Sequence, residues 1–159
     1  IWHLPIVYIC ENNQYGMGTD FRRVSSVEDL TDKAKSYGIP GKQVNGMCAV
    51  SVYEDVKKAV NYAQENQAPT FLEIKTYRYV GHSMSDPAKY RSKEEVAEHK
   101  ENDPILILKN DMIKEGVISE AAYKVLDQKW KDVATAAVKF AQESPEPEID
   151  ELWDDVLED

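Results

Sequence analysis

The feature that most constrains the fold is an alternation of short β-rich runs with helical patterns in the first half of the chain. The apolar run Pro5–Cys10 is typical of a strand that is buried on both faces, as in a parallel sheet. Lys42–Gly46 and Thr70–Tyr79 are the next expected strands. A helical pattern separates each pair of strands, so the sequence predicts an α/β fold with a parallel sheet.

Two helices are expected between these strands. The first is predicted over 25–38, because Ser25 and Glu28 have the spacing of a capping box and Gly38 suits a helix C-terminus. The second is predicted over 52–66, where apolar side chains recur on one helical face. This face consists of Val52, Val56, Ala59, Val60 and Ala63.

The character of the chain changes after Arg91, and only helices are expected beyond it. Ser92 begins one helix, Pro104 opens a second, and Ser119 begins a long third helix that ends near Ser144. The residues 149–159 are compatible with a short amphipathic terminal helix. We therefore divide the chain into an α/β part, 1–91, and a helical packing or subunit-interface region, 92–159.

The long third helix has an apolar stripe at four-three spacing, which indicates packing in a core or an interface rather than a cofactor site. The stripe consists of Leu126, Trp130, Val133, Ala137 and Phe140.

Charge is distributed unevenly along the 159 residues. Residues 1–91 carry eleven Lys and Arg against ten Asp and Glu, whereas residues 92–159 carry eight against nineteen. An acidic surface repels nucleic acid and anionic lipid, and no apolar run approaches the roughly 20 residues of a membrane span. We therefore expect neither a nucleic-acid nor a membrane partner. The acidic tail, from Glu143 onward, is either a solvated surface or a docking surface for a basic partner.

A loop rich in Asn and Gly, Glu11–Asp20, follows the first expected strand. In an open parallel sheet, ligands bind beyond the carboxyl ends of the strands. The side-chain oxygen of Asn13 and the main-chain oxygen of Tyr15 lie two residues apart and can point at one centre. Hard oxygen donors of this kind suit Mg²⁺. The alternative is an ordinary turn without a ligand.

A second loop, Val80–Arg91, follows the last expected strand and reaches the same crevice if the two strands are neighbours. His82 could donate a hydrogen bond to a phosphate or transfer a proton, or could be purely structural. Ser83, Ser85 and Asp86 do not form a catalytic triad, because the chain has no G-x-S-x-G motif and no suitably placed histidine base.

The stretches LPIVYICENNQYGMGT and TYRYVGHSMSDP together resemble the alpha subunits of the decarboxylating component of pyruvate dehydrogenase. The similarity continues through RSKEEV, NDPI and PEPE, so it covers nearly the whole chain. It implies a doubly wound parallel sheet that binds thiamine diphosphate and Mg²⁺, followed by a helical C-terminal region. The family's cofactor motif begins with Gly-Asp-Gly, which is absent here, so we expect that an N-terminal part of the protein precedes Ile1.

The resemblance also implies roles for individual residues. Asn13 would bind Mg²⁺ and contact the cofactor, and Tyr15 would bind Mg²⁺ through its carbonyl. His82 would contact thiamine diphosphate and take part in catalysis. Ser83 matches a serine that kinases phosphorylate in eukaryotic members, whereas Lys89 stands near the position of a second family phosphoserine in a segment one residue shorter.

The function implied by the resemblance is oxidative decarboxylation of pyruvate with acetyl transfer to a lipoyl group. The implied partners are a beta subunit in an α2β2 heterotetramer and the lipoyl acyltransferase core. The location would be cytoplasmic in a bacterium and the mitochondrial matrix in a eukaryote. The alternatives are a branched-chain 2-oxo acid or acetoin dehydrogenase, or a chain that in this form acts only in assembly.

Overall fold

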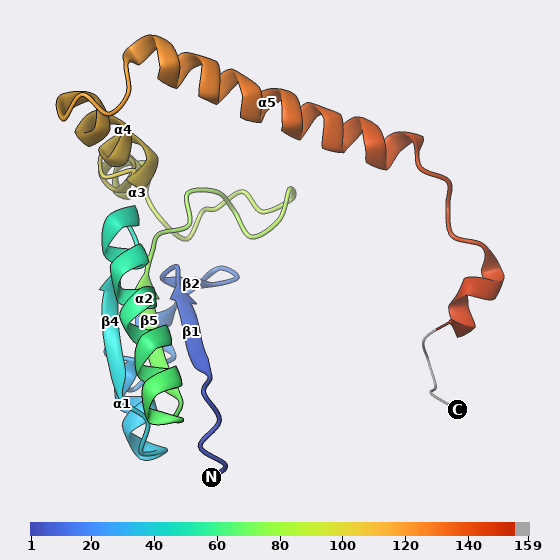
Figure 1. The fold of residues 1–159 in the computed structure, drawn as a ribbon. Helices are drawn as coiled ribbons and strands as arrows, with labels where there is room; N and C mark the ends of the chain where they lie inside the picture. The colour runs from blue at the N-terminus through green and yellow to red at the C-terminus, as the bar shows by residue number, and fades with distance from the viewer. Residues whose placement is uncertain (155–159) are drawn as a thin grey trace. The chain divides into compact units, whose positions relative to one another are not determined.

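A computed structural model describes residues 1–154 and divides them into two compact units, Ile1–Lys114 and Glu115 onward. The first unit contains a parallel sheet in the order β1-β5-β4 (Figure 1). Its strands are β1 (Val7–Asn12), β4 (Gly41–Asn45) and β5 (Thr70–Lys75). The predicted α/β fold with a parallel sheet is therefore confirmed.

Helices cover both faces of this sheet. On one face, Leu72 and Ile74 of β5 pack with Val44 of β4 and with Ala59 of α2 (Ala49–Asn66), forming the buried core. On the other face lies α1 (Thr31–Ser36), which contacts β4 and β5. Because neighbouring strand residues point to opposite faces, Glu73 lies on the α1 side. This two-sided covering confirms the doubly wound arrangement.

The first predicted helix is shorter than the sequence indicated. Ser25 does not cap a helix, because its hydroxyl donates to the carbonyl of Val27 at 2.7 Å and thereby closes a local turn. Helix α1 begins only at Thr31, where the Asp29 carboxylate accepts from the Thr31 amide at 2.9 Å. The predicted C-terminus is confirmed, since Gly38 has φ +70° and its amide donates to Lys35.

The strand β1 was expected to be buried on both faces, and in this structure that expectation is wrong. It lies at the edge of the sheet and pairs with β5 alone, from Val7 opposite Thr70 to Asn12 opposite Lys75. Tyr8 and Ile9 are each 48% exposed. The continuous apolar sequence of this strand is therefore only partly covered by residues 1–154.

Three helices follow β5, as the sequence predicted. The first, α3 (Lys93–Glu101), is capped by the Ser92 hydroxyl, which accepts from the Glu95 amide. The second, α4 (Pro104–Lys114), begins at Pro104, and the third, α5 (Glu120–Glu143), is capped by Ser119. None of the helices among residues 1–154 is long and apolar enough to cross a membrane.

The second compact unit contains α5 and the 3-10 helix η2 (Ile149–Trp153). Residues 155–159 of the expected terminal helix lie outside the described residues. The apolar stripe of α5 is exposed, with Trp130 at 58% and Phe140 at 75%. It does not form a core within residues 1–154. The functional division into 1–91 and 92–159 stays a prediction.

Candidate active site at the carboxyl edge of the sheet

The two predicted loops leave the sheet side by side. Because β1 and β5 pair in parallel with Asn12 opposite Lys75, both strands end at the same edge. The Thr76 amide donates to the Asn12 carbonyl at 2.9 Å, and the Arg78 amide donates to the Asn13 carbonyl at 3.4 Å. The expectation that the loops after these strands share one edge of the sheet is therefore confirmed.

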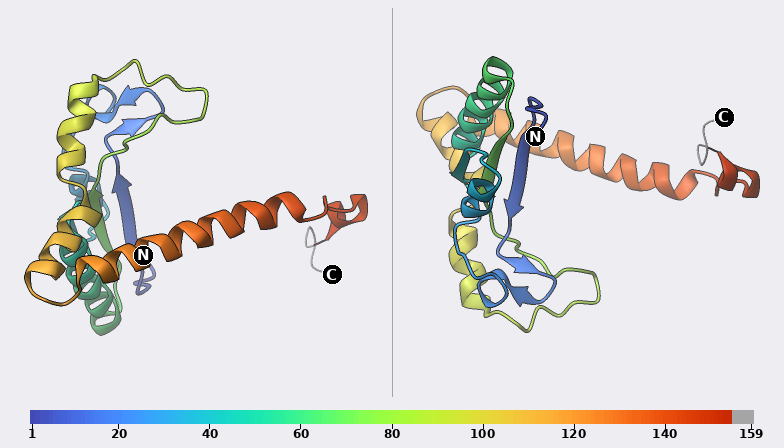
Figure 2. Two further views of the ribbon diagram at one scale, coloured as in Figure 1. Left: turned by 90° about the horizontal axis from the view of Figure 1, so that it is seen from above. Right: turned by 90° about the horizontal axis from the view of Figure 1, so that it is seen from below.

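The first loop folds into a short hairpin. Its strands are β2 (Tyr15–Gly16) and β3 (Thr19–Asp20), and Tyr15 lies opposite Asp20. The Asn13 side-chain oxygen accepts from the Tyr15 amide at 3.1 Å, which fixes the turn into the hairpin. Seen from above and from below, the hairpin lies beside the second loop (Figure 2).

The carbonyl of Tyr15 points away from its partner strand. The Phe21 amide donates to the Gln14 carbonyl at 3.0 Å, so Gln14 and Phe21 occupy a hydrogen-bonded position of the ladder. Hydrogen-bonded positions alternate in an antiparallel pair, and Tyr15 therefore has its amide and carbonyl on the outer side. That carbonyl and the Asn13 side-chain oxygen are neutral hard donors of the type that Mg²⁺ accepts.

These two oxygens would fill only part of an octahedral shell. The residues 1–154 contain no group of three His, Cys, Asp or Glu side chains that could hold a metal by themselves. Two neutral oxygens of this kind suit a cation that takes its other ligands from phosphate or water.

The second loop is organised by one carboxylate. Asp86 accepts from the His82 amide, the Ala88 amide and the Tyr90 hydroxyl, each at 2.8 Å. These bonds lower the pKa of Asp86 to about 2. The His82 side chain is exposed and makes no hydrogen bond within the described part of the chain.

The two serines of this loop lie close together at its surface. The Ser83 and Ser85 hydroxyls lie 3.1 Å apart and are exposed. Asp86 holds the backbone of His82 rather than its imidazole, so it does not orient that imidazole toward either serine. Ser83 remains accessible at the surface of the loop.

Arg78 joins the two loops, and the sequence analysis did not identify it. Its guanidinium donates to the Met17 carbonyl in the hairpin at 2.5 Å and to the Tyr90 hydroxyl in the second loop at 2.7 Å. Gly18 is close to the Tyr90 ring, since a Cβ at Gly18 would lie 3.1 Å from that ring. The alternation of Tyr and Arg in TYRY and KYR is the one sequence signal for this junction.

Arg91 lies at the centre of an aromatic cluster beneath the junction. Its guanidinium carbon lies 5.3 Å from the centroid of Tyr15, 5.2 Å from that of Tyr77 and 5.8 Å from that of Tyr90. The same side chain donates to the carbonyls of Arg78 and Val80. Arg91 therefore links the start of the second loop to the Tyr15 ring in the first loop.

The buried carboxylate of Glu73 stabilises the start of the first loop. Glu73 is fully buried and accepts from the Asn12 side chain at 2.7 Å, the Gln43 side chain at 2.8 Å and the Leu30 amide at 3.1 Å. The Asn12 side-chain oxygen in turn accepts from the Gln14 amide at 3.1 Å. The loop backbone is thus tied through Asn12 to all three strands and to the segment before α1.

Comparison with known proteins identifies relatives of the whole chain. The family model for the dehydrogenase E1 component matches residues 1–150. A pyruvate dehydrogenase E1 component subunit alpha from Rickettsia bellii is 49% identical over 96% of this chain and 47% of that protein. One from Rhizobium meliloti is 44% identical over 99% of this chain and 45% of that protein.

A testis-specific mitochondrial form from Rattus norvegicus is 42% identical over 96% of this chain and 39% of that protein. The chain spans about half the length of the curated relatives it matches, or less.

Proposed function

The chain belongs to the dehydrogenase E1 component family, and from this premise we propose that the complete protein is a pyruvate dehydrogenase alpha subunit. Its reaction is oxidative decarboxylation of pyruvate with acetyl transfer to a lipoyl group. The observation that carries the proposal is the parallel pairing of β1 and β5. It brings the Asn13–Tyr15 oxygen donors and the His82 loop to one edge of the sheet.

Asn13 and Tyr15 would hold Mg²⁺ through the side-chain oxygen and the outward main-chain carbonyl. Thiamine diphosphate, when bound, supplies the electron sink that decarboxylation of a 2-oxo acid needs. His82 would contact the cofactor from the second loop, where its exposed imidazole can donate a hydrogen bond or transfer a proton. Asp86 would orient His82 by holding its backbone amide.

The proposed partners are a beta subunit in an α2β2 heterotetramer and the lipoyl acyltransferase core. We propose neither a nucleic-acid partner nor a membrane partner. The exposed apolar stripe of α5, which includes Trp130, supports a role in subunit packing. The location would be the cytoplasm in a bacterium or the mitochondrial matrix in a eukaryote. Phosphorylation at the exposed Ser83 would add about −1.5 to −2 charges beside an anionic cofactor.

A specificity assay tests the proposal. The complete alpha subunit is assembled with its beta subunit, and carbon dioxide release is measured with pyruvate and with a branched-chain 2-oxo acid. We expect pyruvate to react faster and the rate to require both thiamine diphosphate and Mg²⁺. His82→Ala should lower turnover without changing the thermal unfolding temperature. Preference for the branched-chain acid would favour the alternative dehydrogenase.

The alternative role as an assembly module has a separate test. The 159 residues supply only part of the proposed metal shell, so by themselves they should bind thiamine diphosphate poorly and turn over no substrate. Calorimetric titration of the isolated chain measures this directly. Tight Mg²⁺-dependent binding would show that the site is complete in this half of the protein.

A further inference from the structure

The hairpin that carries Tyr15 depends on its side chains for its position. Each of its strands, β2 and β3, is only two residues long. A two-stranded ribbon is marginally stable by itself, and this one lies beyond the end of the main sheet. The direction of the Tyr15 carbonyl therefore depends on contacts outside the hairpin, and those of the Tyr15 side chain are among them.

The strongest of these contacts is with Glu95 in the first turn of α3. One carboxylate oxygen of Glu95 accepts from the Tyr15 hydroxyl and from the Tyr77 hydroxyl, both at 2.7 Å. The hydrogen bonds lower the pKa of Glu95, whereas burial together with Glu95 raises the pKa of Tyr15. The geometry at 2.7 Å is that of the Tyr15 phenol donating to a carboxylate, and such a hydrogen bond is charge-assisted.

The Glu95 carboxylate is itself held in place. The Ser92 hydroxyl caps α3 by accepting from the Glu95 backbone amide at 3.0 Å. Tyr77 is buried and its ring is stacked on His99, with centroids 3.7 Å apart, so the second donor to Glu95 is also fixed. The Tyr15 ring is tilted against Tyr90 at 5.5 Å. Helix α3 thus presents a rigid acceptor to the hairpin.

We propose that Glu95 is a positioning residue of the metal site, acting through the Tyr15 phenol. By holding the ring of Tyr15, it fixes the residue whose carbonyl points outward and whose amide orients the Asn13 side-chain oxygen. In this role Glu95 would act through Tyr15 without binding the metal itself. The inference rests on the proposed function, because it assumes that the Asn13 and Tyr15 oxygens bind a divalent cation.

Metal binding by the assembled component tests the inference without relying on turnover. Mn²⁺ replaces Mg²⁺, and electron paramagnetic resonance measures bound Mn²⁺ in the presence of thiamine diphosphate. Tyr15→Phe keeps the backbone donor but removes the hydroxyl that holds it. We expect Tyr15→Phe and Glu95→Ala each to weaken Mn²⁺ binding about tenfold, with no further loss in the double variant. Glu95→Gln, which retains an acceptor oxygen, should restore part of the affinity.

Two further variants separate the possible outcomes. Glu94→Ala removes the neighbouring, exposed carboxylate from the first turn of α3 and serves as the matched control, so Mn²⁺ affinity should stay within about twofold of wild type. Asn13→Ala removes a proposed ligand. If Asn13→Ala weakens Mn²⁺ binding but Tyr15→Phe does not, the positioning role of Glu95 is wrong and the metal site stands. If Asn13→Ala also has no effect, the metal site itself is wrong.

Discussion

The backbone amide of His82 donates to the carboxylate of Asp86 at 2.8 Å. The same carboxylate accepts from the Ala88 amide and from the Tyr90 hydroxyl. One side chain therefore closes the loop that carries the proposed catalytic histidine. The imidazole of His82 is left exposed, so the loop presents it without using it for its own stability.

Replacing Asp86 with Ala should loosen this loop, because three donors lose their common acceptor. We expect limited proteolysis of the assembled component to cut within 80–91 several times faster than in wild type. Asp32→Ala, which removes an exposed ion pair with Lys35 on α1, is the control and should leave the cleavage rate unchanged. Equal rates in the Asp86 and Asp32 variants would contradict the anchoring role of Asp86.

Replacing Glu73 with Ala should destabilise the α/β unit strongly. The change leaves the buried Asn12 side chain without its acceptor, at a cost of about 1–3 kcal/mol, and also removes the hydrogen bonds of the exposed Gln43 side chain and the half-buried Leu30 amide, each worth about 1 kcal/mol. Denaturant unfolding of the complete subunit measures the loss, which we expect to exceed about 3 kcal/mol.

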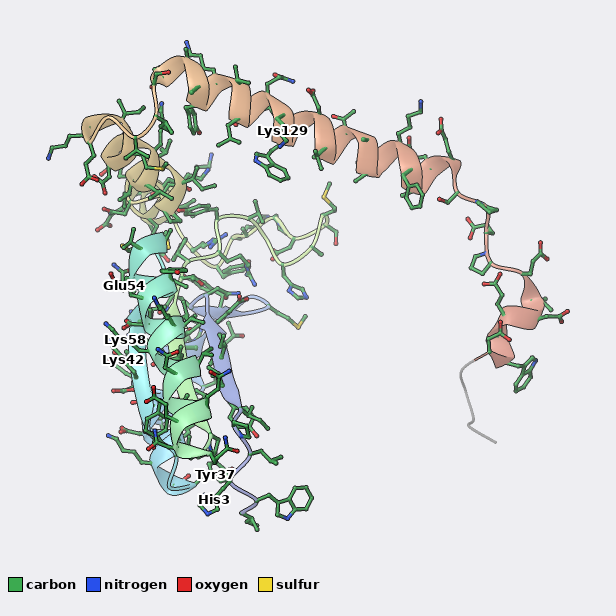
Figure 3. All side chains as sticks on the ribbon, in the orientation of Figure 1. His3, Tyr37, Lys42, Glu54, Lys58 and Lys129 are labelled. Atoms are coloured by element: carbon green, nitrogen blue, oxygen red, sulfur yellow. The ribbon has the colours of Figure 1, made fainter. Side chains whose placement is uncertain are left out.

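The matched control for Glu73 is Glu54→Ala on α2, where the carboxylate is exposed and forms only a long ion pair with Lys58 at 3.9 Å (Figure 3). Its effect on the free energy of unfolding should stay within about 0.5 kcal/mol. A similar loss in both variants would show that the buried hydrogen bonds of Glu73 contribute little.

Gly46 lies where β4 passes close to the end of β5. A Cβ at this position would lie 2.6 Å from the Lys75 carbonyl oxygen, which already accepts from the Gly46 amide. Gly46→Ala should therefore force the backbone apart and cost about 1–3 kcal/mol of unfolding free energy. Gly16→Ala is the control, because nothing lies within 4 Å of the added Cβ. A stable Gly46→Ala variant would show that the strand ends can separate freely.

The alternation of strands and helices was predictable because each element has a local signature. The caps at Ser92 and Ser119 and the C-terminus at Gly38 follow from the residue types at the helix ends, with Glu95 supporting the cap at Ser92. The capping box predicted at Ser25 was wrong, because residue spacing alone does not show whether the Ser25 hydroxyl caps a helix or closes a local turn. Its hydroxyl bonds to Val27 instead.

The site was predictable only in part. The turn at Asn13 and the placement of His82 in a loop after the last strand follow from residue type and position in the sequence. The contacts of Arg78, Arg91 and Glu95 could not be predicted, because they join segments that are brought together only by the parallel pairing of β1 and β5. The exposure of Ile9 on β1 likewise depends on what covers the sheet edge, which no local pattern reports.

Phosphorylation of Ser83 should lower activity in the assembled component. Ser83 is exposed, and a phosphate there would repel the diphosphate and compete with the Ser85 contact. We expect a cognate kinase to reduce carbon dioxide release at least several-fold, and Ser83→Ala to be insensitive to it. Unchanged activity with Ser83 stoichiometrically phosphorylated would refute the switch.

The measurement that tests the central claim most directly is calorimetric titration of thiamine diphosphate into the assembled component, with and without Mg²⁺, for wild type and Asn13→Ala. The account predicts tight Mg²⁺-dependent binding by wild type and at least tenfold weaker binding by Asn13→Ala, since a charged centre loses a ligand. Equal affinity of the two proteins, or wild-type binding that does not depend on Mg²⁺, would contradict it.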